Sequence, residues 1–346
     1  MMAKTAILTC HIAWCGVAAR MINLMLTSCT PEEVGASVVN AHDAEELHAG
    51  LLAAEACISP KFLYDALGSK LFEAICELPE YYPTRTEAAI FERHGAEIAR
   101  VAGLGTTLID LGAGNCAKAA SLFPLLQPAQ YVAVDISSEF VHDALARLRQ
   151  RFPRIAMEAL GMDFSNRFDL PDLVRAERRL FFYPGSSLGN FTPEHAQAFL
   201  ARLRAQCGPD GGILIGIDLA KDKATLDAAY DDALGVTAAF NLNILRHVNH
   251  LVDADFDIRQ WKHHGFYNAA RGRIEMHLEA RSAQHVRWRG GERRFEAGDC
   301  IHTENSYKYQ QADAIGLLER SGFEATRVWT DPQRWFAVIH AQAIPA

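Results

Sequence analysis

The sequence predicts an α/β protein with two domains: a largely parallel sheet with helices on both faces, and a second, α+β domain formed by two chain segments. Three stretches carry this prediction. Residues 105–220 alternate short β-type runs with helices, which indicates parallel strands joined by crossover helices. Residues 35–84 show apolar side chains at helical spacing, and residues 221–308 hold a long helical span followed by strand-like runs.

The composition is that of a folded protein without a nucleic-acid partner. At 346 residues, 49% of them hydrophobic, the chain can bury a sizeable core. A formal net charge of -8, with no run of Lys or Arg, disfavours binding to a polyanion. The eight cysteines lie singly, without a C-x-x-C pair, so we interpret them as reduced thiols of a cytoplasmic protein.

The first residues are interpreted as an N-terminal extension, 1–34. The stretch AILTCHIAWCGVAARMINLML is apolar enough to suggest a signal sequence, but His11 and Arg20 interrupt it. A start of translation at Met21 or Met25 is an alternative interpretation of this stretch. No later stretch approaches the roughly 18 consecutive apolar residues that a spanning helix needs, so no membrane association is expected.

The segment 35–84 and the span 221–308 make up the predicted second domain. Within the first segment, KFLYDALGSKLFEAICEL has the periodicity of an amphipathic helix, and TRTEAAIFERHGAEIARVAG continues the pattern beyond it. Pro60 and Pro83 mark boundaries, and the aromatic stretch PEYYPTR is expected to be a loop.

The predicted sheet domain comprises residues 85–220 and 309–346. Its first strands are TTLIDLGAG, YVAVDIS, a run before GMDF, RRLFFYPG and GGILIGIDL. A final helix, DAIGLLERSGF, precedes a closing pair of strands, EATRVWTD and WFAVIHAQA. Parallel strands of this kind place their ligands at the carboxyl edge of the sheet.

The motif LIDLGAGNCAK, residues 108–118, predicts an adenosyl ligand at that edge. Gly112 and Gly114 allow a tight turn and a close approach of the backbone to a ligand. Asp135 ends the next strand, 23 residues after Gly112, where a carboxylate can accept both hydroxyls of a ribose. A nicotinamide oxidoreductase is disfavoured because the third glycine of the dinucleotide fingerprint is missing.

Two further loops follow strands of the same sheet. In GMDF, Asp163 is either an adenine contact or a turn residue, and Phe164 is either a platform for adenine or part of the core. In LFFYPGSSLGNF, Asn190 can donate and accept hydrogen bonds, as a bound amino acid requires, but a role in the turn is the alternative.

Polar and aromatic residues outside the sheet supply the other candidates. Tyr64, Tyr81, Tyr82 and Tyr230 are each candidates, although a single tyrosine is also explained by packing. The run HTENSYKY contains Glu304 and Ser306. The 14 histidines include no H-E-x-x-H motif, and no metal site is predicted.

These blocks resemble the histidine-specific methyltransferases of ergothioneine biosynthesis, which share their fold with fungal N-methyltransferases of tryptophan derivatives. The resemblance spans residues 58–346. It rests on SPKFLYDALGSKLFEAICELPEYYPTRTE, DLGAGNCAKA, FYPGSSLGNFTPEHA, IDLAKDKATLDAAYDDALGVTAAFNLNIL and RWFAVIHA. It implies a Rossmann-like class I methyltransferase sheet, a substrate-binding second domain, S-adenosylmethionine as cofactor and a small-molecule amino-acid substrate. A monomer is expected because no heptad or exposed apolar stripe in the sequence suggests an interface.

The resemblance also implies a role for each site residue. The positions matching cofactor contacts are Gly112, Lys118, Asp135, Asp163 and Phe164. Those matching substrate contacts are Tyr81, Asn190, Tyr230, Met276, Glu304 and Ser306, with Tyr64 orienting the reacting amine as the catalytic candidate. Within this set Asn190 and Tyr230 match positions at the substrate carboxylate, and Glu304 with Ser306 matches the pair that holds the imidazole.

The expected reaction is therefore methylation of the α-amino nitrogen of L-histidine, three times, to trimethylhistidine (hercynine). N-methylation of tryptophan or a derivative is the alternative, and it is disfavoured because a carboxylate at Glu304 suits an imidazole better than an indole. A non-catalytic adenosyl-binding sensor is the alternative of another class. Two departures from the family pattern bear on substrate preference: Asn305 replaces an apolar residue, and Leu67 stands where Arg is usual.

Overall fold

The computed structural model describes residues 41–136, 138–164, 168–208 and 210–345. The features below belong to one compact unit, His42–Ala346, together with the start of its first helix at Ala41. The predicted extension, 1–34, lies outside the described residues.

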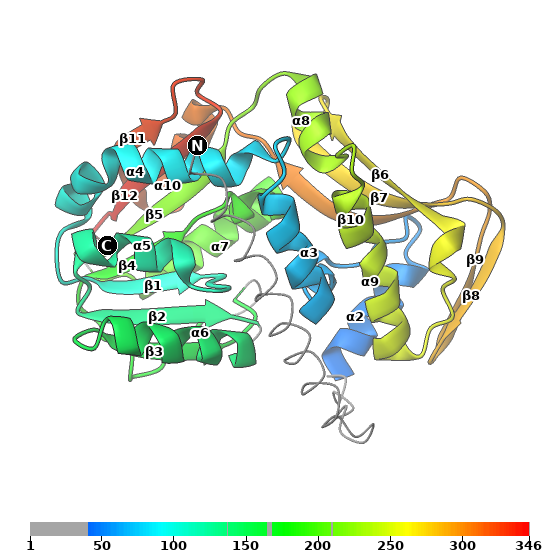
Figure 1. Cartoon of the computed structure of the whole chain (residues 1–346), viewed down its shortest axis with the longest axis horizontal. Coiled ribbons are helices and arrows are strands. Elements are labelled where there is room, and N and C mark those ends of the chain that lie inside the picture. The colour runs from blue at the N-terminus through cyan, green and yellow to red at the C-terminus, as the bar shows by residue number, and fades with distance from the viewer. Residues whose placement is uncertain (1–40, 137, 165–167, 209, 346) are drawn as a thin grey trace, which may run out of the picture. The chain divides into compact units, whose positions relative to one another are not determined.

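A seven-stranded sheet organises one half of this unit (Figure 1). Its strands lie in the order β11-β12-β5-β4-β1-β2-β3. They are β1 (Thr107–Leu111), β2 (Gln130–Asp135), β3 (Ala156–Gly161), β4 (Arg179–Tyr183), β5 (Gly212–Asp218), β11 (Phe323–Thr330) and β12 (Phe336–Ala343). Strands β1 to β5 pair in parallel, whereas β12 is antiparallel to both β5 and β11. The parallel sheet predicted from the alternating pattern is confirmed, and its direction of growth reverses at β1, where open sheets bind ligands.

Helices cover both faces of this sheet because successive strand residues point to opposite sides. Leu108 joins the core under α4 (Tyr82–Ala102), α5 and α6, whereas Ile109 joins the core under α7 and α10. The other covering helices are α5 (Ala117–Leu126), α6 (Ser138–Arg151), α7 (Pro193–Gln206) and α10 (Gln311–Arg320). The predicted two-sided helical cover is therefore confirmed.

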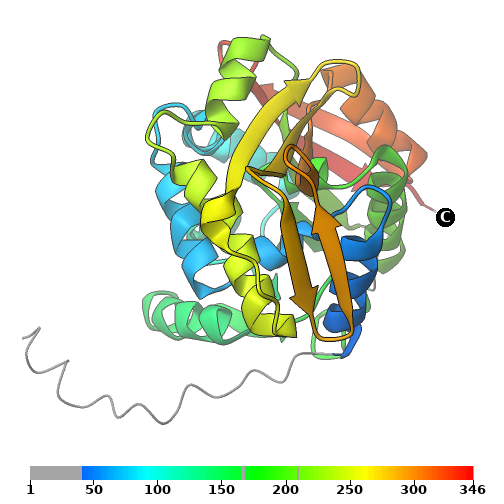
Figure 2. The ribbon, with the colours of Figure 1, turned by 90° about the vertical axis from the view of Figure 1, so that its right-hand side faces the viewer.

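The second domain combines helices with antiparallel strands, and Figure 2 faces these strands. A three-stranded sheet has the order β10-β7-β6, and β8 pairs with β9 as a separate hairpin. The elements are α2 (Ala41–Leu52), η1 (Pro60–Leu63), α3 (Ala66–Cys76), α8 (Lys223–Tyr230), α9 (Val236–Val252), η3 (Ile258–Gln260), β6 (Trp261–Asn268), β7 (Arg273–Ala280), β8 (Gln284–Trp288), β9 (Gly291–Phe295) and β10 (Cys300–Tyr307).

Both chain segments contribute to one apolar core of this domain. Leu63 and Tyr82 from the first segment join Ile244 and Trp261 from the second. At the rim, the Arg293 guanidinium donates to carbonyl oxygens at and just beyond the end of α2, which ties the β8–β9 hairpin to that helix. Figure 2 shows this hairpin beside α2. A second domain is thus present, while its exact boundaries at 84/85, 220/221 and 308/309 stay a prediction.

The loop predicted at PEYYPTR is shorter than expected. Helix α4 begins at Tyr82, so Pro83 and the residues after it lie in its first turn. Proline is tolerated there because its missing N–H has no helical partner at that position in any case. Among the described residues, no helix is long and apolar enough to cross a membrane.

Candidate active site

The first part of the site is a glycine turn where β1 ends. Gly112 and Gly114 have φ angles of 72° and 51°, in the left-handed region that favours glycine. The N–H of Gly112 donates to the Val134 carbonyl (2.9 Å), and that of Gly114 donates to the Asp135 carboxylate (2.9 Å). The turn therefore places its backbone beside the acidic residue at the carboxyl end of β2.

Phe164 brings the chain after β3 to the same turn. A Cβ built on Gly112 would lie 3.9 Å from Cζ of Phe164. The ring also makes edge contacts with Tyr183 and packs at 5.9 Å from Phe199, so it belongs partly to the core. Asp163, directly before it, is half-buried. Packing thus accounts for one side of Phe164, while its edge faces the glycine turn.

Lys118, in the first turn of α5, forms an ion pair with a glutamate that sequence reasoning missed. Its Nζ lies 2.7 Å from Oε2 of Glu87, on α4. The other oxygen of Glu87 accepts from the Gly185 N–H (2.8 Å), in the loop after β4. Glu87 is almost fully buried, so it joins α4, α5 and the β4 loop at the ligand edge of the sheet.

Aromatic rings form the second part of the site. Tyr64 packs against Phe72 and Phe240, with ring centroids 5.6 Å apart in both pairs. Phe72 packs in turn against Tyr81 (6.1 Å), which packs against Tyr230 (6.0 Å). Burial raises the pKa of Tyr81 well above its usual value, so its hydroxyl stays protonated at neutral pH. The structure thus gathers three predicted tyrosines from separate segments.

Glu304 lies opposite Met276 in the register of β10 and β7. A β-bulge between His302 and Glu304 shifts the pairing there, and Thr303 is held by bonds from its hydroxyl to Asn241 Oδ1 (2.7 Å) and the Met276 carbonyl (3.0 Å). Glu304 is only 8% exposed. Burial raises the pKa of its carboxyl to about 7, although the Lys308 ammonium opposes this shift.

The two departures from the family pattern have different positions. The Oδ1 of Asn305 accepts a hydrogen bond from Nε2 of His302 (2.9 Å), whereas its neighbours Glu304 and Ser306 point to the opposite face of β10. Leu67 lies on α3 and is 42% exposed. Asn305 therefore faces away from the residues that the resemblance assigns to the imidazole.

Asn190 reaches this region through the 3-10 turn η2 (Ser187–Asn190). A Cβ on Gly189 would lie 2.8 Å from the Tyr307 carbonyl and 3.5 Å from Oγ of Ser306, so only glycine lets η2 lie this close to β10. Asn190 follows directly and is half-buried. The turn η2 of the sheet domain therefore lies against β10 beside Ser306.

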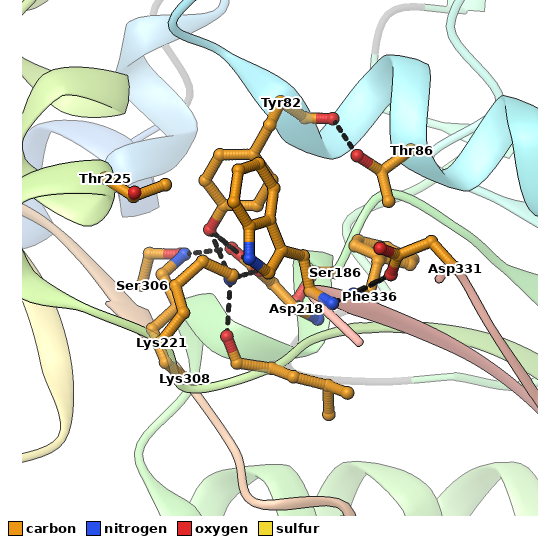
Figure 3. Close-up of polar contacts among 12 residues, drawn as sticks. Tyr82, Thr86, Ser186, Asp218, Lys221, Thr225, Ser306, Lys308, Asp331 and Phe336 are labelled. Carbon is orange, nitrogen blue, oxygen red and sulfur yellow. Dashed lines mark hydrogen bonds and ion pairs between the residues drawn. The ribbon is translucent and has the colours of Figure 1, made fainter. Parts of the chain in front are cut away.

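Ser306 and Tyr230 share a buried partner that sequence reasoning also missed. Their hydroxyl oxygens are 3.0 Å apart, and Nζ of Lys308 lies 2.8 Å from Ser306 Oγ and 2.9 Å from Tyr230 Oη. Lys308 is in turn paired with Asp218, at the end of β5 (2.8 Å; Figure 3). The signal was available: in HTENSYKY, residues 304, 306 and 308 alternate and so share one face of the strand.

The two parts of the site meet through one loop. Gly185 is bonded to Glu87 on the cofactor side, and Oγ of the next residue, Ser186, accepts from the Asp218 N–H (2.8 Å) on the other. The loop after β4 therefore joins the glycine-turn side of the site to the end of β5. In the described part of the chain no group of three His, Cys, Asp or Glu side chains could hold a metal.

A family model described as "Histidine-specific methyltransferase, SAM-dependent" matches residues 43–343. The chain belongs to this family. It is 40% identical over 293 residues to a histidine N-alpha-methyltransferase of Mycolicibacterium smegmatis, covering 83% of this chain and 90% of that protein. A histidine N-alpha-methyltransferase of Mycobacterium tuberculosis is 36% identical over 292 residues, with the same two shares.

Among solved structures, an S-adenosylmethionine-dependent methyltransferase from Clostridium acetobutylicum gives a TM-score of 0.45 at 12% identity, over 81% of this chain and 97% of that chain. The family match confirms the predicted S-adenosylmethionine-dependent N-methyltransferase and its cofactor. The predicted Rossmann-like sheet agrees with the strand order described above.

Proposed function

We propose that the protein transfers methyl groups from S-adenosylmethionine to the α-amino nitrogen of L-histidine. Three transfers give Nα,Nα,Nα-trimethyl-L-histidine (hercynine), the first step of ergothioneine biosynthesis. The observation that carries the proposal is the buried Glu304 carboxylate, opposite Met276 and two residues before Ser306 on one face of β10. A family of histidine-specific enzymes and relatives that act on the α-nitrogen of histidine support it.

The carboxyl edge of the sheet fits the cofactor. The left-handed glycine turn leaves open space at Gly114, because a Cβ built on this residue would meet no atom within 4 Å. Asp135 beside it suits the ribose hydroxyls, Asp163 suits the adenine amino group, and Lys118 suits the cofactor's carboxylate. When bound, the cofactor supplies a methyl group on a positively charged sulfur.

The imidazole end of the substrate is assigned to β10. Glu304 accepts an imidazole N–H, and Ser306 donates to or accepts from the other ring nitrogen. Met276, buried in register with Glu304, packs against the ring. An indole offers a single N–H on a larger ring, which leaves a buried polar group unpaired, so the tryptophan-derivative alternative is disfavoured.

The amino-acid end is assigned to Asn190, Tyr230, Tyr81 and Tyr64. Asn190 and Tyr230 bind the carboxylate, because an amide N–H and a phenol O–H are both donors. Tyr81 and Tyr64 orient the amine through their hydroxyl lone pairs. Attack needs a neutral nitrogen, so one proton leaves before each transfer, and the enzyme contributes chiefly alignment.

Repeated methylation is supported by the rings that line this end. Tyr64, Phe72, Tyr81 and Phe240 make consecutive edge or tilted contacts with centroids 5.6 to 6.1 Å apart. Aromatic faces favour quaternary ammonium groups through cation–π attraction. This aromatic environment is therefore compatible with the positively charged trimethylammonium group of the final product.

Mass spectrometry of the products tests the function. The purified protein is incubated with S-adenosylmethionine and, separately, histidine, tryptophan or buffer. We expect a gain of three methyl groups on histidine and none on tryptophan. Methylated tryptophan would overturn the assignment of Glu304, and cofactor binding without any methylated amino acid would favour the sensor alternative.

We also propose that the enzyme acts as a cytoplasmic monomer. The five described cysteines, Cys57, Cys76, Cys116, Cys207 and Cys300, are all free thiols, which supports a reducing compartment. Light scattering at micromolar concentration tests the monomer, with a mass near twice that of one chain as the contradicting result.

A further inference from the structure

The strongest unassigned feature is the cluster around Asp218, where the chain passes between its two domains. The chain crosses before α4, after β5 and after β10, and each crossing brings one side chain to Asp218 (Figure 3). These are Tyr82, Lys221 and Lys308. The backbone joins the same place, because Leu219 forms a β-bridge with Tyr309.

The cluster is buried and fully bonded. Tyr82 donates to the Asp218 carboxylate (2.8 Å), Lys221 lies 2.6 Å from one of its oxygens and Lys308 2.8 Å from the other. The side chains of Lys308 and Asp218 are 0% and 1% exposed. Burial disfavours their charges, but their mutual attraction outweighs it: the pKa of Asp218 lies below its usual range and that of Lys308 above. Lys308 therefore stays charged across the working pH range.

Lys308 differs from Lys221 in what else it contacts. An ammonium has three N–H donors, and those of Lys308 go to Asp218, Tyr230 and Ser306. The second lysine contacts Asp218, Tyr82 and the Leu219 carbonyl, none of which is assigned to substrate. The two ammonium groups thus share one carboxylate but serve different neighbours.

The three donors of Lys308 constrain the hydroxyl protons. Tyr230 and Ser306 each accept from Lys308, so neither can donate to it. One of their two protons closes the 3.0 Å bond between them. The other proton must point away from Lys308, so it is available to donate to a bound molecule.

We propose that Lys308, held in place by Asp218, is a positioning residue for the amino-acid substrate, because it makes the paired hydroxyls of Tyr230 and Ser306 present a donor to the substrate carboxylate or imidazole. This inference rests on the proposed function. It also assigns a reason for placing a charged cluster at the domain crossings: the alignment of the domains sets the alignment of the substrate hydroxyls.

Two single variants test this inference, because each leaves one lysine on Asp218 and so avoids an unpaired buried carboxylate. Lys308→Met removes the hydroxyl contacts, and Lys221→Met is the matched control. We expect Lys308→Met to raise the KM for histidine by about 10- to 100-fold, the range for hydrogen bonds to charged groups. Cofactor affinity, measured by calorimetry, should stay within about 2-fold, and Lys221→Met should raise the histidine KM by less than about 3-fold.

A pH profile adds a readout that a purely structural role would not move. The charged or titratable groups that interact with Glu304 are Lys308, Tyr64, Tyr81 and Tyr230. Of these, only Lys308 favours the ionised carboxylate. The pH below which histidine affinity falls should therefore be higher in Lys308→Met than in the wild type. An unchanged pH would count against the inference.

A double-mutant cycle separates positioning from general destabilisation. If Lys308 acts through Tyr230, then Lys308→Met should cost much less in a Tyr230→Phe background than in the wild type. Additive losses, equal effects of the two lysine variants, or a parallel loss of cofactor affinity would overturn the inference. If Lys308→Met does not fold, the neutral pair Asp218→Asn/Lys308→Met carries the same test. Absence of methylated histidine from the wild type would instead contradict the proposed function.

Discussion

The cofactor edge and the substrate region are built in different ways. At the cofactor edge, backbone groups do much of the work: Gly112 and Gly114 turn the chain, and the Gly114 N–H fixes Asp135. The substrate region is instead made of side chains from segments far apart, such as Tyr81 and Glu304. Backbone geometry depends on few residues, so it suits a ligand common to many enzymes, whereas side chains allow one amino acid to be selected.

The two regions also differ in charge. Asp135 at the cofactor edge is half-buried at the end of a strand, while Glu304 and Lys308 are nearly or fully enclosed. Low dielectric strengthens interactions in the substrate region and makes any unpaired polar group costly there. Selectivity for the amino acid should consequently reside in the substrate region. Substitutions at the cofactor edge should change cofactor affinity, and substitutions in the substrate region should change histidine affinity.

The largest separable effect is expected for Asp135→Ala. Losing two charge-assisted hydrogen bonds to ribose, each worth about 1.5–3 kcal/mol, should weaken cofactor binding by roughly 100- to 1000-fold or more. Isothermal titration with S-adenosylhomocysteine measures this. Asp143→Ala, an exposed aspartate on α6, is the control. A change below about 5-fold in Asp135→Ala would remove Asp135 from the cofactor site.

The contact between the two regions is tested by Gly189→Ala. The new methyl group would lie 2.8 Å from the Tyr307 carbonyl, so η2 must shift away from β10. Overpacking of this kind costs about 1–3 kcal/mol. Urea unfolding should show that loss, together with a raised KM for histidine. Gly316→Ala, within α10, serves as control and should be neutral or stabilising, since alanine favours helix and its methyl meets only the flexible end of Arg320.

A smaller effect should appear in the pH dependence of histidine binding. Burial raises the pKa of Glu304 to about 7, so below that pH the free enzyme carries a protonated carboxyl, which is the weaker acceptor, and above it a carboxylate. Histidine affinity, measured with S-adenosylhomocysteine bound, should rise as pH increases through about 7, by up to about tenfold per unit below it. The same titration of Glu304→Gln should lack this rise in affinity. A rise that persists unchanged would belong to another titrating group.

The smallest effect is expected for Asn305→Val. Its side chain contacts His302 on the face of β10 away from Glu304, so the kcat/KM for histidine should change by less than about 2-fold, as for surface substitutions within about 0.5 kcal/mol. Ser306→Val, one residue later on the other face, should lower it far more. Equal effects of the two substitutions would show that the face assignment of β10 is wrong.

The same difference explains how far the sequence alone could lead. The glycines and Asp135 belong to one strand–turn–helix–strand unit, so their spacing predicted an adenosyl site directly. No such pattern links Tyr64, Asn190 and Glu304, whose proximity depends on how the domains pack. Their roles came only from the resemblance.

The long-range contacts of residues that act through other residues were missed for the same reason. Tyr82 and Asp218 are bonded across 136 positions, and Glu87 meets Gly185 across 98. No local periodicity reports such contacts. Lys308 is the exception, since its alternation with Glu304 and Ser306 is visible in the strand. The start of α4 at Tyr82 was also missed, because two prolines flanking two tyrosines favour a loop locally while the helix is completed by packing.

The most direct test of the account is a pair of calorimetric titrations on Glu304→Ala, with Glu279→Ala, on the neighbouring strand β7, as control. S-adenosylhomocysteine is titrated first, and histidine is then titrated into the saturated protein. The account predicts unchanged cofactor affinity and a loss of histidine affinity of about 100-fold or more, because a buried imidazole N–H is left without its acceptor. Histidine binding within about 3-fold of the wild type, or an equal loss of both ligands, would contradict it.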